Sequence, residues 1–250
     1  MSPYNRKDRF FKKAKDDEYA ARSVYKLEEI QRRYGMLKKG SRIVDLGCAP
    51  GSWMQFLEKH VGKKGAAVGY DIEPVSIGTG KNVRTFVADV RTMSPERVRA
   101  DLAELIGAIK NKTATAAPPP PQPEPLDEED AGQLAEPHEA PAPAEPEVVV
   151  HAPPNLRIDG LISDMAPKLT GIRDADQAKS VALVAHALRL SESLVVEGGF
   201  FIAKLFQGRD TDEFVQEIKK VFKDVKLLKP DATREGSREV FVVARQRRPL

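Results

Sequence analysis

The chain has 250 residues, of which 40 are Lys or Arg and 37 are Asp or Glu, giving a formal net charge of +3. Its single cysteine, Cys48, excludes an internal disulfide framework and any zinc site built from several cysteines. No apolar run approaches the ~18 residues that span a membrane, and the charged start lacks the apolar core of a signal peptide, so we expect a soluble, cytoplasmic protein.

Residues 1–19 form a basic N-terminal arm. Within it, residues 5–15 hold six basic residues and one acid, interleaved with Phe10 and Phe11. Two interpretations stay open: a frayed, solvated terminus, or an arm that lies along phosphates. Residues 20–35 then carry apolar side chains at helical spacing, and Gly35 is a suitable C-terminal stop for that helix.

Strands and helices alternate along the rest of the chain, which predicts a mostly parallel sheet covered by helices on both faces. Ser94 is the expected N-cap of one helix. The expected strands are 42–46, 66–71, 83–89, 159–165, 198–206, 224–230 and 238–245. The expected helices are 53–61, 94–107, 174–196 and 211–222.

Residues 113–156 differ in composition from everything around them, with nine acids, no Lys or Arg, and 12 of the 19 prolines. Such a segment buries too little apolar surface to offset the entropy of ordering, so we expect a disordered insertion within one domain formed by 20–112 and 157–250. Three interpretations of this segment stay open: a solvated spacer, a mimic of RNA that competes for the basic face, or a segment that binds a partner. Because the segment carries −9, the other 206 residues carry +12, and this asymmetry favours a nucleic-acid partner.

The segment 45–53, DLGCAPGSW, joins a strand to a helix. Gly47 and Gly51 allow a tight turn and a close approach of the backbone to a ligand. The string is neither GxGxxG nor a loop with GK[ST], so it matches dinucleotide and nucleoside triphosphate sites poorly. Acids at four successive strand ends would line one crevice at the carboxyl edge of the sheet, with Asp71 suited to a ribose diol and Asp89 to an adenine amino group. They are Asp45, Asp71, Asp89 and Asp164.

Four strings make the chain resemble the FtsJ/RrmJ family of S-adenosylmethionine-dependent ribosomal RNA 2'-O-methyltransferases. They are DLGCAPGSW (45–53), SDMAP (163–167), AKLF (203–206) and SREVFVVA (237–244). The resemblance spans about 20–110 and 157–245, and it implies a single Rossmann-like methyltransferase domain whose seven-stranded sheet has its last strand antiparallel. It also implies S-adenosyl-L-methionine as cofactor. The implied substrate is a uridine ribose of large-subunit ribosomal RNA, in the 50S subunit or a late precursor.

The resemblance further implies a catalytic tetrad of Lys26, Asp164, Lys204 and Glu239. The cofactor-binding residues that it implies are Asp45, Gly47, Cys48, Ala49, Pro50, Gly51, Trp53, Asp71, Ile72, Asp89, Val90 and Asp164. We expect no metal and a monomer. One position departs from the family, which often carries a tyrosine two residues past the glutamate. Phe241 stands there, and any hydrogen bond from that hydroxyl is in doubt.

Lys204 interrupts the apolar run 200–206, where an unpaired ammonium would be unfavourable to bury, and Asp164 is its natural partner. A ribose 2'-hydroxyl is a weak nucleophile that needs alignment and loss of its proton. A neutral Lys204 would act as base, which requires depression of its pKa by burial and by Lys26. A charged Lys204 would act electrostatically instead. Lys26 and Glu239 would position the ribose and the ammonium.

RNA contacts are expected from basic residues that are equally consistent with solvated charges: Arg32, Arg33, Lys38, Lys39 and Arg42. Tyr4, Phe10 and Phe11 are candidates for stacking on bases, whereas Phe241 is expected in the core. The alternatives are a methyltransferase acting on transfer RNA or another RNA, and a non-catalytic RNA-binding ribosome assembly factor. An oxidoreductase would require GxGxxG, and a methyltransferase of proteins or small molecules leaves the basic body unexplained.

Overall fold

The computed structural model describes residues 9–75, 77–78, 80–110 and 153–249. Tyr4 and the beginning of the basic arm lie outside the described residues. So does the acidic insertion, apart from its last four residues, 153–156. Among the described residues, no helix is long and apolar enough to cross a membrane.

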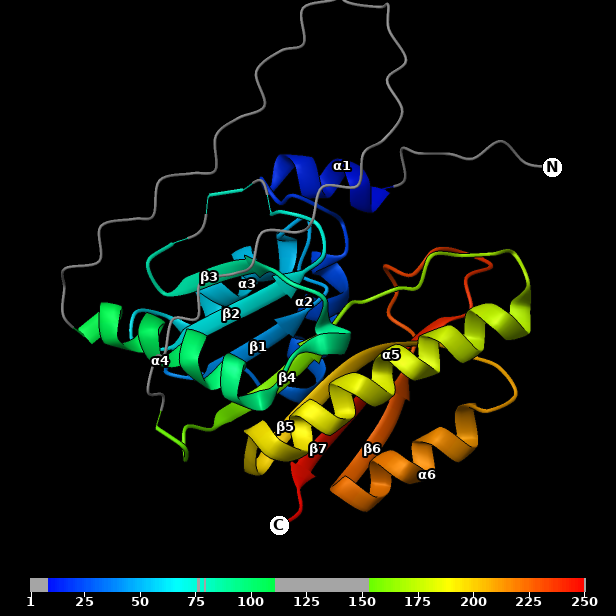
Figure 1. The fold of residues 1–250 in the computed structure, drawn as a ribbon. Helices are drawn as coiled ribbons and strands as arrows, with labels where there is room; N and C mark the ends of the chain where they lie inside the picture. The colour runs from blue at the N-terminus through cyan, green and yellow to red at the C-terminus, as the bar shows by residue number, and fades with distance from the viewer. Residues whose placement is uncertain (1–8, 76, 79, 111–152, 250) are drawn as a thin grey trace, which may run out of the picture.

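Seven strands form one sheet in the order β3-β2-β1-β4-β5-β7-β6 (Figure 1). The pairs β1–β2, β1–β4, β2–β3 and β4–β5 are parallel, and β7 runs antiparallel to both β5 and β6. This confirms the predicted fold class and the antiparallel last strand. The strands are β1 Arg42–Leu46, β2 Ala66–Asp71, β3 Val83–Val87, β4 Ile158–Ser163, β5 Val195–Phe206, β6 Phe222–Leu228 and β7 Glu239–Arg247.

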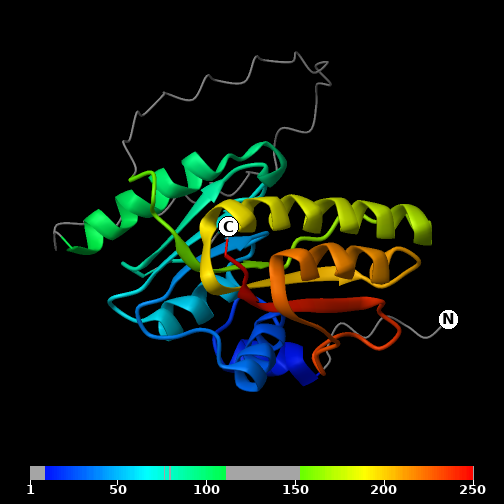
Figure 2. The ribbon, with the colours of Figure 1, turned by 90° about the horizontal axis from the view of Figure 1, so that it is seen from below.

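Helices cover both faces of the sheet, as Figure 2 shows from below. One apolar core joins α4, α5 and α6 to one face, and a second core joins α2 and α3 to the other. The helices are α1 Arg9–Asp16, α2 Val24–Tyr34, α3 Ser52–Val61, α4 Pro95–Lys110, α5 Arg173–Leu194 and α6 Thr211–Val221, with a short 3-10 helix η1 at Val90–Thr92. The parallel strands β1, β2, β3, β4 and β5 therefore end at one common edge between two packed layers.

The residues predicted to end or cap helices do so in the structure at Gly35 and Ser94. Gly35 closes α2 in the left-handed conformation with φ 59°, and the Ser94 hydroxyl accepts a hydrogen bond from the Arg97 amide at 3.3 Å. Most other boundaries differ from expectation by one to four residues. The arm contains helix α1, and the strand expected to reach Asp89 ends at Val87, because Asp89 instead caps η1 by accepting the Arg91 amide at 2.9 Å.

Candidate active site

A cavity of about 700 Å³ opens at the carboxyl edge of the sheet. Residues that follow β1, β2, β3 and β4 line one side, and α5 forms the other. The predicted cofactor residues that line it are Gly47, Ala49, Asp71, Ile72, Asp89, Val90 and Asp164. This volume lies within the ~300–1,000 Å³ range of small-molecule sites.

The glycine turn forms the floor of the cavity next to β4. Gly47 has φ +81°, a left-handed conformation that favours glycine. A Cβ added there would lie 2.7 Å from Met165 Cγ and 2.8 Å from the Met165 amide nitrogen. Gly51 likewise has φ +113° as it opens α3. The close approach of two backbone segments therefore requires glycine at position 47.

Two of the strand-end acids are already held by hydrogen bonds. Asp71 accepts the Ala49 amide at 2.9 Å, which ties the glycine turn to the end of β2. Asp89 binds the Arg91 guanidinium through both carboxylate oxygens, at 2.9 Å from Nε and 2.5 Å from Nη2. The Arg91 side chain and amide lower the pKa of Asp89 to about 2, so this carboxylate is ionised at neutral pH.

Asp45 lies deeper than the other acids. Its side chain is fully buried in β1, and neither carboxylate oxygen has a hydrogen-bond partner among the described residues. Burial raises the pKa of Asp45 well above its ordinary value, and the charges of Asp164 and Asp71 raise it further. Three acids therefore converge under the cavity, an arrangement that suits a cationic ligand.

The four predicted catalytic residues form two ion pairs. Lys204 Nζ donates to Asp164 Oδ1 at 2.8 Å and also to the Asp164 carbonyl. Lys26, on α2, is paired with Glu239, the first residue of β7. All four side chains are at most 16% exposed.

Strand register explains why the two ion pairs meet. In the antiparallel β5–β7 pair, Lys204 lies opposite Phe241 and Phe206 lies opposite Glu239. Residues two apart on a strand share a face, so Lys204, Phe241 and Glu239 all face α2. Lys26 Nζ completes the group 5.7 Å from the centre of the Phe241 ring.

Comparison with known proteins identifies the family of the chain. The model of the FtsJ-like methyltransferases matches residues 19–247. The chain belongs to that family. It is 37% identical over 240 residues to the Ribosomal RNA large subunit methyltransferase E of Syntrophobacter fumaroxidans, covering 96% of this chain and 95% of the relative. The protein of the same name from Myxococcus xanthus is 35% identical, with 98% and 92% covered.

The fold agrees with this family. A crystal structure of a Plasmodium falciparum protein assigned as a ribosomal RNA methyltransferase superposes with a TM-score of 0.64 at 22% identity, covering 92% of this chain and 98% of that one. The predictions of family, enzyme class and cofactor are thus confirmed, and the chain is a methyltransferase that uses S-adenosylmethionine. Asp71, Asp89 and Asp164 place acidic side chains on the wall of the cavity, and this lining fits a ligand with a cationic sulfonium.

Several residues predicted to bind this cofactor do not line the cavity of the methyltransferase. Cys48 is 2% exposed and Asp45 is fully buried. Pro50 is exposed beside the turn, and Gly51 packs against Ile77. Trp53 belongs to the core. Its indole Nε1 donates to the Ser23 carbonyl at 2.9 Å, and its ring lies 6.0 Å from that of Phe241. Phe241 is fully buried, as expected for a core residue.

The α5 wall of the cavity is absent from the sequence prediction. Lys179, Ala182, Leu183 and His186 line the cavity at the helical spacing i, i+3, i+4 and i+7. That spacing is visible in the sequence, but it does not reveal that this face of α5 points at the crevice. Burial, followed by the charge of Arg189, lowers the pKa of His186.

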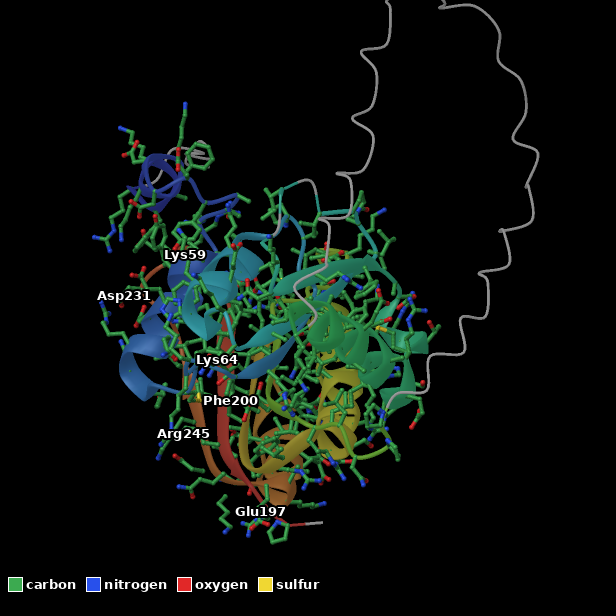
Figure 3. The ribbon with its side chains drawn as sticks, turned by 90° about the vertical axis from the view of Figure 1, so that its left-hand side faces the viewer. Lys59, Lys64, Glu197, Phe200, Asp231 and Arg245 are labelled. Carbon is green, nitrogen blue, oxygen red and sulfur yellow. The ribbon has the colours of Figure 1, made fainter. Side chains whose placement is uncertain are left out.

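Two of the predicted phosphate-contacting residues, Lys39 and Arg42, lie at one edge of the sheet. Arg42 opens β1, so it lies at the amino edge of the sheet, opposite the cavity. Lys39 belongs to the same edge and donates from Nζ to the Lys59 carbonyl at 2.6 Å. Figure 3 views this side of the molecule and shows Lys64 on it. These residues lie away from the four predicted catalytic residues, so any RNA contact they make is remote from that group.

Proposed function

We propose that this methyltransferase transfers a methyl group to a ribose 2'-hydroxyl of large-subunit ribosomal RNA. The names of the relatives support the RNA substrate. The observation that carries the proposal is the position of Asp164, which lines the cofactor cavity and holds the Lys204 ammonium at 2.8 Å. In the finer proposal the enzyme is a cytoplasmic monomer that acts on a uridine in the 50S subunit or a late precursor.

The cofactor residues have distinct proposed roles. The turn at Gly47 and Ala49 allows the backbone to approach the ligand, and Asp71 accepts hydrogen bonds from a ribose diol. Asp89 accepts a hydrogen bond from an adenine amino group through the carboxylate lone pairs that are not already bonded to Arg91. When bound, S-adenosylmethionine supplies an activated methyl group on a positively charged sulfur. The Asp164 carboxylate, which lines the cavity, is proposed to stabilise that charge.

Lys204 is proposed to act on the 2'-hydroxyl. Its ammonium donates to both the carboxylate and the carbonyl of Asp164, and two such acceptors stabilise the charged form. A charged Lys204 stabilises negative charge that develops on the 2'-oxygen during attack, as preorganised donors do in other active sites. If Lys204 instead releases its own proton before attack, Nζ accepts the hydroxyl proton.

Lys26 and Glu239 are proposed to position the nucleophile. Their ion pair adjoins Lys204 across Phe241, so it holds the second cation of the site in a fixed place. The Lys26 ammonium keeps two donors for the ribose beyond the one that Glu239 accepts. Phe241 supplies no hydroxyl here, so the site relies on these ion pairs for its polar contacts.

Transfer of labelled methyl to undermethylated large subunits, free ribosomal RNA and transfer RNA in parallel tests this function, with the product nucleoside identified. Lys204→Ala is expected to lower kcat by about 10²–10³-fold, the effect of removing one preorganised donor, while cofactor affinity stays within about twofold. Lys64→Ala, at the opposite edge, is the control and should behave as wild type. Near-normal turnover by Lys204→Ala would refute the role assigned to the tetrad.

The same assay decides between the alternatives. A 2'-O-methylated nucleoside found in transfer RNA alone would identify a transfer RNA enzyme. Tight binding to subunits without any methyl transfer would identify a non-catalytic assembly factor. The presence of all four tetrad residues in paired geometry favours catalysis.

A further inference from the structure

Two large apolar side chains stand exposed on the segment Met165–Ile172, which joins β4 to α5 and is called here the β4–α5 loop. Leu169 is 64% exposed and Ile172 is 65% exposed. We propose that these two side chains form an apolar wedge that packs against an unpaired base of the RNA beside the target nucleotide. The proposal rests on the function proposed above and assigns a positioning role within it.

The loop is held in shape rather than left free. Asp176, 3% exposed, accepts hydrogen bonds from the Thr170 amide and hydroxyl, each at 2.7 Å, and from the Gly171 amide at 3.2 Å. The Thr170 hydroxyl oxygen in turn accepts the Ile172 amide at 3.3 Å. A buried carboxylate that fixes the tip of a loop presents Leu169 and Ile172 in a defined place, so little order is lost when a partner binds.

The loop begins at the reaction centre. Asp164 precedes it directly, and the stretch Met165–Lys168 lines the cofactor cavity. Leu169 follows five residues after Asp164, which limits the separation of their Cα atoms to about 18 Å. Figure 1 shows the loop projecting past the carboxyl ends of the strands before it enters α5. A nucleotide whose ribose reaches Lys204 therefore has its neighbours beside this loop.

Positively charged residues surround the wedge, as expected for a surface that binds RNA. Lys168 and Arg173 flank the two apolar residues in the sequence and are exposed, and Lys179 lines the adjoining cavity. RNA combines an anionic backbone with apolar base faces, so a cationic rim around an apolar tip complements it. A nucleotide inside folded RNA must leave the base stack to bring its ribose into a protein site. Inserted apolar side chains are a known means of unstacking neighbouring bases.

Kinetics of full-length variants on undermethylated large subunits form the first test. Leu169→Ser and Ile172→Ser are expected to lower kcat/KM for the subunit by about tenfold, the order expected when a buried Leu or Ile side chain loses its apolar contact. Their cofactor affinity should stay at the wild-type level, which also shows that they fold. Leu227→Ser, at a 39% exposed apolar position on the edge strand β6, is the matched control and should keep full activity.

Crosslinking forms the second test and locates the contact. The chain has one cysteine, Cys48, and it is 2% exposed, so a thiol introduced by Leu169→Cys is selectively modified with a photoactivatable reagent. Reverse transcription should then stop within about two nucleotides of the methylated one, while Leu227→Cys gives no such stop.

Crosslinks to distant nucleotides or to a ribosomal protein would overturn the wedge, as would variants as efficient as wild type. If wild-type enzyme places no methyl on ribosomal RNA, the proposed function itself fails and the wedge with it. If wild-type enzyme methylates and the Leu169 and Ile172 variants match it, the wedge alone fails.

Discussion

Asp45→Asn is expected to stabilise the protein, and increasingly so as the pH rises. The wild-type carboxylate is fully buried with no hydrogen-bond partner among the described residues, and burial raises its pKa well above the ordinary value. The folded state therefore keeps a proton that the unfolded state has already released. The contribution of protonated Asp45 to the unfolding free energy is fully present below about pH 4, the pKa of an Asp in the unfolded chain. It is lost as the pH rises through the raised pKa of Asp45 in the folded protein.

The stability difference between wild type and Asp45→Asn follows from the one proton that Asp45 binds in the folded state. Between the unfolded and the raised folded pKa, the wild type loses about 1.4 kcal/mol of unfolding free energy per pH unit relative to a variant without the ionisable group. For a domain of this size, that difference is roughly 3–5 °C in Tm per pH unit. Above the folded pKa the gap becomes constant. The nearly isosteric amide should leave the packing of β1 unchanged.

Thermal denaturation of both proteins in steps from pH 5 to pH 8 measures this gap, and taking the difference cancels groups that titrate alike in both. Asp231→Asn, at an exposed position, is the control and should track the wild type. A gap that stays constant across the whole range, or an Asp45→Asn protein that is less stable at pH 8, would refute the buried-charge reasoning.

Three shorter predictions follow from the same site. Gly47→Ala should destabilise the protein by about 1–2 kcal/mol, because alanine is strained in the left-handed conformation. It should also weaken cofactor binding in a calorimetric titration, because its Cβ would lie 2.8 Å from the Met165 amide nitrogen. Unaltered cofactor affinity would contradict this. Glu239→Gln should lower the unfolding free energy by about 3 kcal/mol, because Lys26 loses its buried partner. Adding Lys26→Met should recover part of that loss in a double-mutant cycle. Additive losses of unfolding free energy would argue against the ion pair. Burial raises the pKa of the Cys48 thiol, so Cys48 should react with thiol reagents only on unfolding, and rapid labelling of the native protein would show an open turn.

The strands that surround the glycine turn could be predicted from sequence because each signal there is local. The segment 42–46 combines apolar, β-branched residues with a glycine immediately after it, and β1 has those bounds. The end of β3 could not be predicted in this way. Asp89 resembles a strand-end acid in the sequence, but its side chain accepts the Arg91 amide and caps η1, which is a choice between two local uses of one carboxylate.

Sheet register explains why the four strand-end acids do not share one depth. Asp45 lies opposite Gly69 and Ile162, two residues before Asp71 and Asp164 respectively. Asp45 is thus still inside the sheet, whereas Asp71 and Asp164 reach the cavity. The sequence shows that all four acids occur near strand ends, but the relative stagger of neighbouring strands depends on packing over the whole sheet.

Asp164 links the cavity to Lys204, so variants of these two residues separate cofactor binding from methyl transfer. Asp164 lines the cavity proposed for the cofactor, and its carboxylate also accepts a hydrogen bond from the Lys204 ammonium. Asp164→Asn is therefore expected to weaken cofactor binding and slow methyl transfer together, because the amide has lost the negative charge that serves both partners. Lys204→Ala keeps that charge and should slow transfer alone. Titrating the cofactor into both variants measures the first effect, and single-turnover transfer measures the second. Loss of cofactor affinity in Lys204→Ala equal to that in Asp164→Asn would show that the lysine, rather than the shared carboxylate, organises the cavity.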